Sequence, residues 1–120
     1  MAIPDFQSVM LPLLRLCADG KEHAIGETTD ILADQFKLTD DERKALLPSG
    51  IQKIFRNRVA WAKSHLKMAG LFETPKRGIY RITEIGLETF RRNPSSINLK
   101  YFQQFSEYEA FRKTHRPRPE

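Results

Sequence analysis

Apolar residues in the first third of the chain recur at three- and four-residue spacing, which is typical of helices with one buried side. A first helix is expected from Asp5 to the Asp19-Gly20 pair that ends it, with a bend at Pro12. A short strand is expected at Ala24–Ile25. A second helix follows, with the apolar positions Ile31, Leu32 and Phe36.

The middle of the chain contains two segments with the spacing of a helix-starting capping box, Thr39–Glu42 and Ser49–Gln52. The first predicts a brief helix over Ala45–Leu47, which ends at the Pro-Ser-Gly sequence that follows. The second predicts a long helix that continues to Ala69 and stops at Gly70.

Beyond the long helix the pattern changes to that of short strands. Residues 71–74 and 79–82 are expected to pair as a hairpin. Its tip should be basic, because Lys76 and Arg77 stand in the connecting sequence Pro75–Gly78.

Two further helices are expected after the hairpin. Thr83 should cap a helix over 85–90, and an amphipathic helix is expected at 99–111. The complete order predicts a mainly α fold with a small β-hairpin (α+β), namely a winged helix-turn-helix with an additional C-terminal helix. A chain of 120 residues builds one core. We therefore expect a winged-helix domain at 1–92, a C-terminal helical extension at 93–112 and a linker at 113–120.

Charge is unevenly distributed along the chain, whose net charge is +5. The first 42 residues hold nine acidic and three basic side chains, a net charge of −6. Residues 43–72 include seven basic side chains and no acidic one. This asymmetry is typical of a face that binds a polyanion such as DNA or RNA, although a basic face can also be simply solvated.

The long helix divides into two faces when its residues are placed at about 100° per step. The face expected to pack holds Ile51, Phe55, Val59, Ala62, Leu66 and Ala69. At its edge, Trp61 is expected in the core, and Arg58 is expected to meet either DNA or an acidic residue of the first 42. The opposite face has four cations and no acid, as a helix in the major groove requires. It holds Gln52, Lys53, Arg56, Asn57, Ala60, Lys63, Ser64 and Lys67.

Position along the helix suggests which residues contact DNA bases and which contact phosphates. Lys63 and Lys67 lie far from the helix start and are assigned to phosphates, as is Ser49 beside the exposed amides of the first turn. Lys76 and Arg77 of the hairpin tip are expected to reach the adjacent groove or backbone. In helix-turn-helix docking the start of the recognition helix meets base edges. The base-reading candidates are therefore Gln52, which also has the capping role, Lys53, Arg56 and Asn57.

No arrangement of catalytic or metal-binding residues is recognisable, so we expect no enzyme activity, metal or cofactor in this chain. The three histidines are far apart in sequence, and the single cysteine does not accompany them. Cys17 is expected to be a core thiol. The longest apolar stretch, 9–18, is too short to span a membrane, and no export signal is recognisable, which predicts a cytoplasmic location.

A series of motifs resembles the N-terminal domain of the Mrr restriction protein group. Each motif alone is weakly specific, but their order and spacing over almost the whole chain are specific. The motifs are Val9–Leu14, Leu46–Gly50, Phe55, Asn57-Arg58-Val59 with Trp61-Ala62, Leu66 with Ala69-Gly70-Leu71, Arg77-Gly78 with Tyr80, Ile82-Thr83 and Gly86, and Ile97-Asn98 with Lys100.

The resemblance implies a DNA-recognition module of a modification-dependent (type IV) restriction endonuclease, which cuts DNA bearing methylated bases. It also implies a nuclease domain C-terminal to residue 120, while the base and sequence that are read stay open. Two other functions stay open as well, a free-standing winged-helix transcription regulator and a winged helix that binds only protein. A homodimer formed through the aromatic C-terminal helix, Tyr101–Phe111, would fit the regulator.

Overall fold

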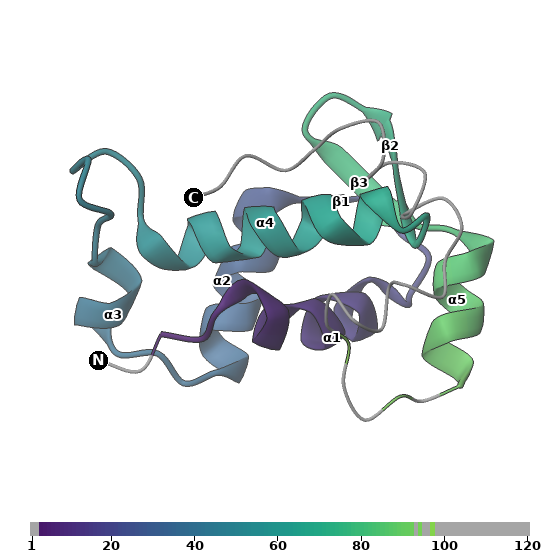
Figure 1. Ribbon diagram of the computed structural model, residues 1–120, viewed down its shortest axis with the longest axis horizontal. Coiled ribbons are helices and arrows are strands. Elements are labelled where there is room, and N and C mark those ends of the chain that lie inside the picture. Colours follow the sequence, from purple (N-terminus) through teal and green to yellow (C-terminus); the bar gives the residue numbers. More distant parts are fainter. Residues whose placement is uncertain (1–2, 93, 95–96, 98–120) are drawn as a thin grey trace.

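The computed structural model describes residues 3–92, 94 and 97. Within them, five helices and a three-stranded antiparallel sheet form an α+β fold around a hydrophobic core (Figure 1). The helix expected at 99–111, nearly all of the extension at 93–112 and the linker at 113–120 lie outside the described residues.

Helix α1 (Phe6–Cys17) has the predicted bounds and includes Pro12. It begins at Asp5, whose carboxylate accepts a 2.7 Å hydrogen bond from the backbone N–H of Ser8. Cys17 is fully buried, which confirms the predicted core thiol, and this burial raises its pKa to about 12. The side chains that α1 buries are Val9, Met10, Leu11, Leu13, Leu14 and Cys17.

Strand β1 (His23–Ala24) leads directly into helix α2 (Ile25–Gln35). Both elements are predicted by the sequence. Helix α2 buries a short stripe of side chains against α1 and α4, which consists of Thr28, Leu32 and Ala33.

Helix α3 (Asp40–Lys44) begins with the predicted capping box. The Thr39 hydroxyl accepts a hydrogen bond from the N–H of Glu42 at 3.1 Å, and the Glu42 carboxylate accepts one from the N–H of Thr39 at 2.8 Å. The helix predicted over Ala45–Leu47 is wrong. The chain turns to an extended conformation after Lys44, and residue 46 forms an antiparallel bridge with Lys53.

Helix α4 (Ile54–Met68) begins later than the sequence predicts, because the Ser49–Gln52 capping box does not form. The N–H of Leu47 donates to the carbonyl of residue 52 at 2.8 Å, and this bond holds the segment as a loop before the helix. Lys53 is the N-cap residue and makes no side-chain cap. Ile51, which is predicted to pack, lies in this loop and is 85% exposed.

Strands β2 (Phe72–Lys76) and β3 (Ile79–Ile82) form a hairpin, and β1 pairs with the other side of β3, giving the order β1-β3-β2. The hairpin turn consists of Arg77-Gly78 and is shorter than the predicted tip, with Gly78 at φ +77°. Pro75 is tolerated in β2 because this is an edge strand, where a proline costs no essential ladder hydrogen bond.

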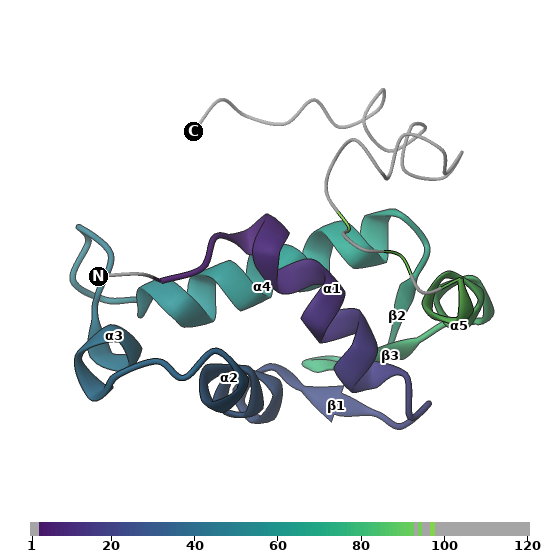
Figure 2. The ribbon, with the colours of Figure 1, turned by 90° about the horizontal axis from the view of Figure 1, so that it is seen from below.

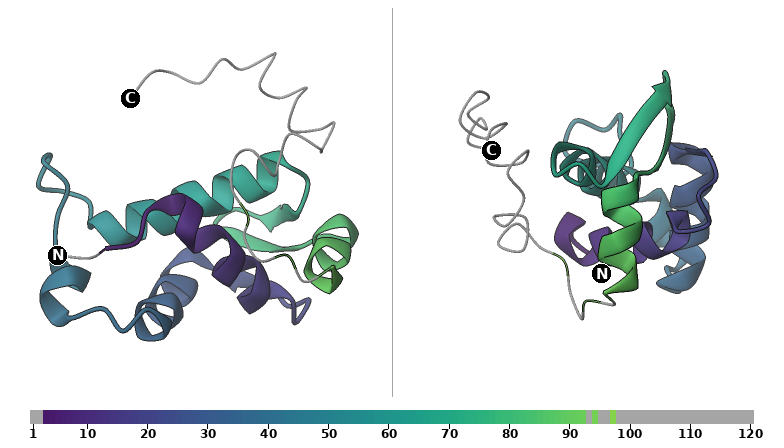
Figure 3. Two further views of the ribbon diagram at one scale, coloured as in Figure 1. Left: turned by 60° about the horizontal axis from the view of Figure 1, so that its bottom comes forward. Right: turned by 90° about the vertical axis from the view of Figure 1, so that its right-hand side faces the viewer.

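Helix α5 (Glu84–Arg91) begins at Thr83, whose hydroxyl accepts a hydrogen bond from the N–H of Gly86 at 3.1 Å, as the sequence predicts. Helices α1 and α4 cross at the centre of the molecule, and α2 packs beside them (Figure 2). The β2–β3 hairpin projects beyond the helices near the end of α4 (Figure 3). The core therefore lies under one face of α4 and leaves the other face exposed.

Candidate nucleic-acid interface

The two predicted faces of α4 are confirmed from Phe55 onward. The side chains that face the core are buried, namely Phe55, Val59, Ala62, Leu66 and, just past the helix, Ala69. On the other side, Lys53, Arg56 and Lys67 are exposed, and Asn57 and Lys63 are half-buried. Helix α4 therefore presents cations and an amide to solvent without a neighbouring acid from its own sequence.

Asn57 links the first turn of α4 to the preceding loop. Its side-chain N–H donates to the Gln52 side-chain oxygen at 3.2 Å, and its backbone N–H donates to the carbonyl of Lys53 at 3.1 Å. Ser49 lies in the loop itself, where its hydroxyl oxygen is 3.4 Å from the N–H of Ile51. Gln52 and Asn57 are thus together at the helix start, whereas the contact of the Ser49 hydroxyl is within the loop.

Lys53 and Arg56 line a pocket of about 150 Å³ between α2, α3 and the start of α4. The Arg56 NH1 nitrogen lies 3.7 Å from the position that a Cβ would take at Gly26 of α2. No ion pair is formed by Lys53 or Arg56 with any other residue that the structure describes. The lining residues are Gly26, Thr29, Asp30, Ala33, Arg43, Lys53, Phe55 and Arg56.

Lys63 is turned toward the sheet. Its Nζ lies over the ring of Tyr80, 5.8 Å from the ring centroid, and the hydroxyls of Tyr80 and Thr28 are hydrogen-bonded to each other. Burial, and then the charge of Lys67, lower the pKa of Lys63. This lysine is therefore less accessible to a ligand than its position on the helix face predicts.

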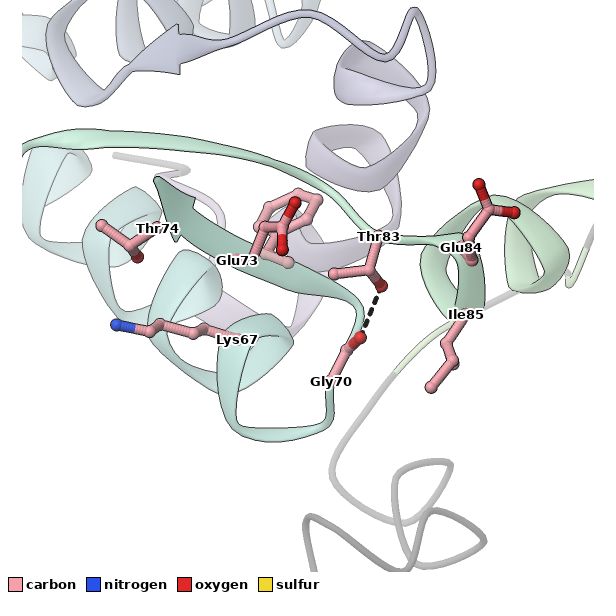
Figure 4. A pocket seen from close by; sticks show the side chains of 8 residues that line it. Lys67, Gly70, Glu73, Thr74, Thr83, Glu84 and Ile85 are labelled. Carbon is pink, nitrogen blue, oxygen red and sulfur yellow. Dashed lines mark hydrogen bonds between the residues drawn. The ribbon is translucent and has the colours of Figure 1, made fainter. Parts of the chain in front are cut away.

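Lys67 borders an open pocket of about 430 Å³ between α4, β2 and the start of α5. Figure 4 shows its side chain extending alongside Thr74 of β2. The pocket is closed at one end by the Thr83 hydroxyl, which donates to the carbonyl of Gly70 at 2.5 Å. Glu73 and Glu84 also line it, so this pocket does not concentrate positive charge.

Lys76 and Arg77 are both exposed at the end of the hairpin. The Nζ of Lys76 lies 3.8 Å from a carboxylate oxygen of Glu22, a surface pair that holds the lysine only weakly. The hairpin and the loop before α4 rise on the same side of α4, at its two ends (Figures 1 and 3). The basic tip therefore extends the exposed face of α4.

Arg43 is a further basic residue of this region that the sequence does not assign to the site. Its Nε donates to the carbonyl of Leu38 at 3.1 Å, and its NH2 donates to Asp34 at 2.8 Å. The only signal in the sequence is its position as the first residue of the acid-free segment. Its convergence on Lys53 and Arg56 depends on how α3 packs against α4.

Arg58 and Trp61 lie at the edge of the packed face of α4. The charge of Arg58 contributes to lowering the pKa of Asp5, after the larger effect of the cap hydrogen bonds from Ser8, but Arg58 forms no ion pair with a described residue, so its expected partner stays a prediction. Trp61 is 40% exposed, and its predicted place in the core is wrong. The His65 ring, not that of Trp61, stacks on Phe6 with centroids 4.9 Å apart.

His23 forms a separate ionic cluster at β1, the edge strand opposite β2. It is buried between two carboxylates, with Nε2 3.0 Å from Asp19 and Nδ1 2.8 Å from Glu27. Among the described residues, no group of three or more histidine, cysteine, aspartate or glutamate side chains is arranged to hold a metal ion. In the same part of the chain, no helix has the length and apolar character to cross a membrane.

Residues 6–92 match the family model of the Mrr N-terminal domain. The type IV methyl-directed restriction enzyme EcoKMrr of Escherichia coli (strain K12) is 32% identical over 98 residues, which cover 81% of this chain and 32% of that protein. The chain thus spans about a third of the length of that relative. No solved structure matches the present chain. Because the family model covers most of the chain and most of its described fold, this protein belongs to the Mrr N-terminal domain family.

Proposed function

We propose that this chain is the duplex DNA-binding module of a restriction-system protein. The exposed face of α4 carries the proposal, because it offers Lys53, Arg56 and Lys67 with no acidic residue on the helix. Cationic and amide side chains on one helix face are what contacts to phosphates and base edges require. The name of the related E. coli protein, a methyl-directed restriction enzyme, supports methylated DNA as the target.

We infer a winged-helix mode of binding. The element order and the sheet order β1-β3-β2 support it, with α4 as the recognition helix and the β2–β3 hairpin as the wing. The hairpin and the α4 start lie on one side of the molecule, so both reach a duplex laid along α4 (Figure 3). In this arrangement the start of α4 enters the major groove, and the hairpin tip meets the adjacent groove or backbone.

The contacts that we propose follow the position of each side chain. Asn57 and its partner Gln52 face base edges at the helix start, together with Lys53 and Arg56. Backbone contacts are assigned to residues farther along α4 and outside it, namely Ser49, Lys63, Lys67, Lys76 and Arg77.

Cleavage of DNA is assigned to a nuclease domain elsewhere in a longer parent protein. The family is that of an N-terminal domain, and the relative is about three times as long as the matched segment, which supports this division. Purified chain with magnesium or manganese is therefore expected to leave methylated and unmethylated plasmid intact. Cleavage that persists through repurification would contradict the assignment.

Fluorescence anisotropy with methylated, unmethylated and scrambled duplexes tests the DNA-binding proposal. Each neutralised phosphate contributes about 0.9 to the slope of log affinity against log salt, so binding should weaken steeply as salt increases. A flat salt response would contradict DNA binding through this basic face. Equal affinity for the methylated and unmethylated duplexes would contradict methyl recognition alone.

A further inference from the structure

We propose that the pocket between α2, α3 and the start of α4 binds one backbone phosphate of the DNA, with Arg43 as a contact residue. The inference rests on the proposed function and adds both a place and a residue to it. The occupant is a phosphodiester of duplex DNA.

Three cations line the pocket beside a buried aromatic residue. Arg43 comes from α3, Lys53 and Arg56 come from the start of α4, and the buried Phe55 also lines it. A space of about 150 Å³ is much larger than the roughly 10–15 Å³ that one water needs. A phosphate group and its bridging waters therefore fit between the three cations.

The charge of this pocket favours an anion. Asp30 is the one acid among its eight lining residues, against three cations. Lys53 and Arg56 make no ion pair within the described part of the chain, so their charge is available to a ligand. The planar guanidinium groups of Arg43 and Arg56 are suited to the tetrahedral oxygens of a phosphate.

Arg43 is positioned before any ligand arrives. Its hydrogen bonds to the carbonyl of Leu38 and to the carboxylate of Asp34 use Nε and NH2. Its NH1 has no hydrogen-bond partner among the residues that the structure describes. A guanidinium held in this way loses little conformational freedom when NH1 binds a phosphate oxygen.

This assignment changes the role expected for Arg56. Its NH1 lies against the first turn of α2, beside Gly26, rather than over the middle of the α4 face. A strand that crosses the pocket therefore takes both Arg56 and Lys53 as backbone contacts and leaves Asn57, with Gln52, to face the base edges. Contacts of this kind fix the position of a protein on the duplex without reading its sequence.

The first experiment compares Arg43→Ala with Lys44→Ala in anisotropy titrations of one duplex at several salt concentrations. Both residues belong to α3 and both variants remove one positive charge, but only Arg43 lines the pocket. Arg43→Ala should lower the salt slope by about one unit and weaken binding about tenfold at low salt. Lys44→Ala should stay within about twofold of wild type, as expected for the loss of an exposed, screened charge that does not line the pocket.

The second experiment tests the pocket without removing Arg43. Thr29→Glu places a carboxylate among the three cations, whereas Gln35→Glu places one at the exposed end of the same helix. Thr29→Glu should keep the thermal unfolding midpoint of wild type and lose about one unit of salt slope. Gln35→Glu should bind like wild type.

Two outcomes separate this inference from the proposed function. If wild type does not bind duplex DNA, the proposed function and the inference both fail. If wild type binds, but Arg43→Ala matches Lys44→Ala and Thr29→Glu matches Gln35→Glu, only the phosphate pocket is overturned.

Discussion

The ammonium group of Lys63 lies over the ring of Tyr80, with Nζ 5.8 Å from the ring centroid. This contact joins the cationic face of α4 to β3, the central strand of the sheet. Lys67, one turn further along α4, is exposed. Two lysines that the sequence pattern treats alike therefore have different surroundings.

Replacing either lysine by alanine removes a proposed phosphate contact, but only the loss of Lys63 should also lower the stability of the domain. Lys63→Ala should lower the free energy of unfolding by roughly 0.5–1 kcal/mol, because a partly buried cation–π contact is lost. Lys67→Ala should leave stability unchanged and reduce the salt slope of DNA binding by about one unit. Urea unfolding and anisotropy titrations of both variants measure the two effects. Identical behaviour of the variants in both assays would contradict this division.

Asn57→Ala should remove discrimination between base pairs. A side-chain amide that pairs with a base edge contributes about 1–3 kcal/mol of specificity, so the affinity ratio between preferred and scrambled duplexes should fall accordingly. Ser64→Ala is the matched control, because Ser64 is a small polar residue on the same face, farther from the helix start. A uniform loss of affinity with an unchanged ratio would show that Asn57 does not read bases.

The stability of the domain should depend on pH through His23. Burial lowers the pKa of the imidazole, but its hydrogen bonds and ion pairs with Asp19 and Glu27 outweigh burial and raise it above the ordinary value of 6.5. A group with a raised folded-state pKa stabilises fully below its unfolded pKa, and this contribution is lost as pH rises through the folded pKa. The free energy of unfolding should therefore decrease from pH 6.5 upward.

Asp19, a partner of His23, should make stability depend on pH in the opposite direction, at acidic pH. Burial raises the pKa of Asp19, but its bonds to His23 and to the N–H of Lys21 dominate and lower it below 3.8. Its contribution is present above pH 3.8 and is lost as pH falls through the folded pKa. Urea unfolding across pH should show greatest stability between 3.8 and 6.5. Glu27→Gln should shift the loss of stability at higher pH to lower pH values. If this loss stays at the same pH, the role of the His23–Glu27 pair is contradicted.

Gly86→Ala should destabilise the domain strongly. A Cβ at Gly86 would lie 2.3 Å from the carbonyl oxygen of Leu71 and 2.5 Å from a side-chain carbon of Ile82, so α5 would have to move away from the strands. Overpacking of this kind costs typically 1–3 kcal/mol.

The control for this substitution is Gly26→Ala, in another helix. A Cβ there meets only the end of Arg56 at 3.7 Å, an ordinary contact. Because alanine favours helix over glycine, this variant should be as stable as wild type or more stable, by up to about 1 kcal/mol. Thermal unfolding of both variants measures the contrast, and equal midpoints would refute the close packing at Gly86.

Local signals in the sequence predict most of the fold. Asp19-Gly20, the Thr39–Glu42 capping box, Gly70 and Thr83 all act through neighbours a few residues away, and each is found where it is expected. Such interactions depend little on the rest of the chain, so they can be recognised from residue spacing.

The errors occur where a longer-range interaction competes with a local one. The Ser49–Gln52 spacing is as good as that of Thr39–Glu42, but backbone pairing of Leu46 with Lys53 takes the segment out of the helix and leaves Ile51 exposed. The residues of the candidate site show the same limit of prediction from sequence spacing. Helical spacing places Lys53 and Arg56 on one face, whereas their approach to Arg43 follows only from the packing of three helices.

The pairing of β1 with β3 joins residue 23 to residue 80, across most of the folded chain. During synthesis, α1, α2 and α4 emerge from the ribosome before β3 does, so β1 has no strand to pair with until residues 79–82 are available. Leu71, which is buried just before β2 and whose carbonyl accepts a hydrogen bond from the N–H of Thr83, also lacks its full surroundings until then. The sheet therefore cannot form until the hairpin has been synthesised, and a nascent chain that stalls after α4 should be a target for chaperones and proteases.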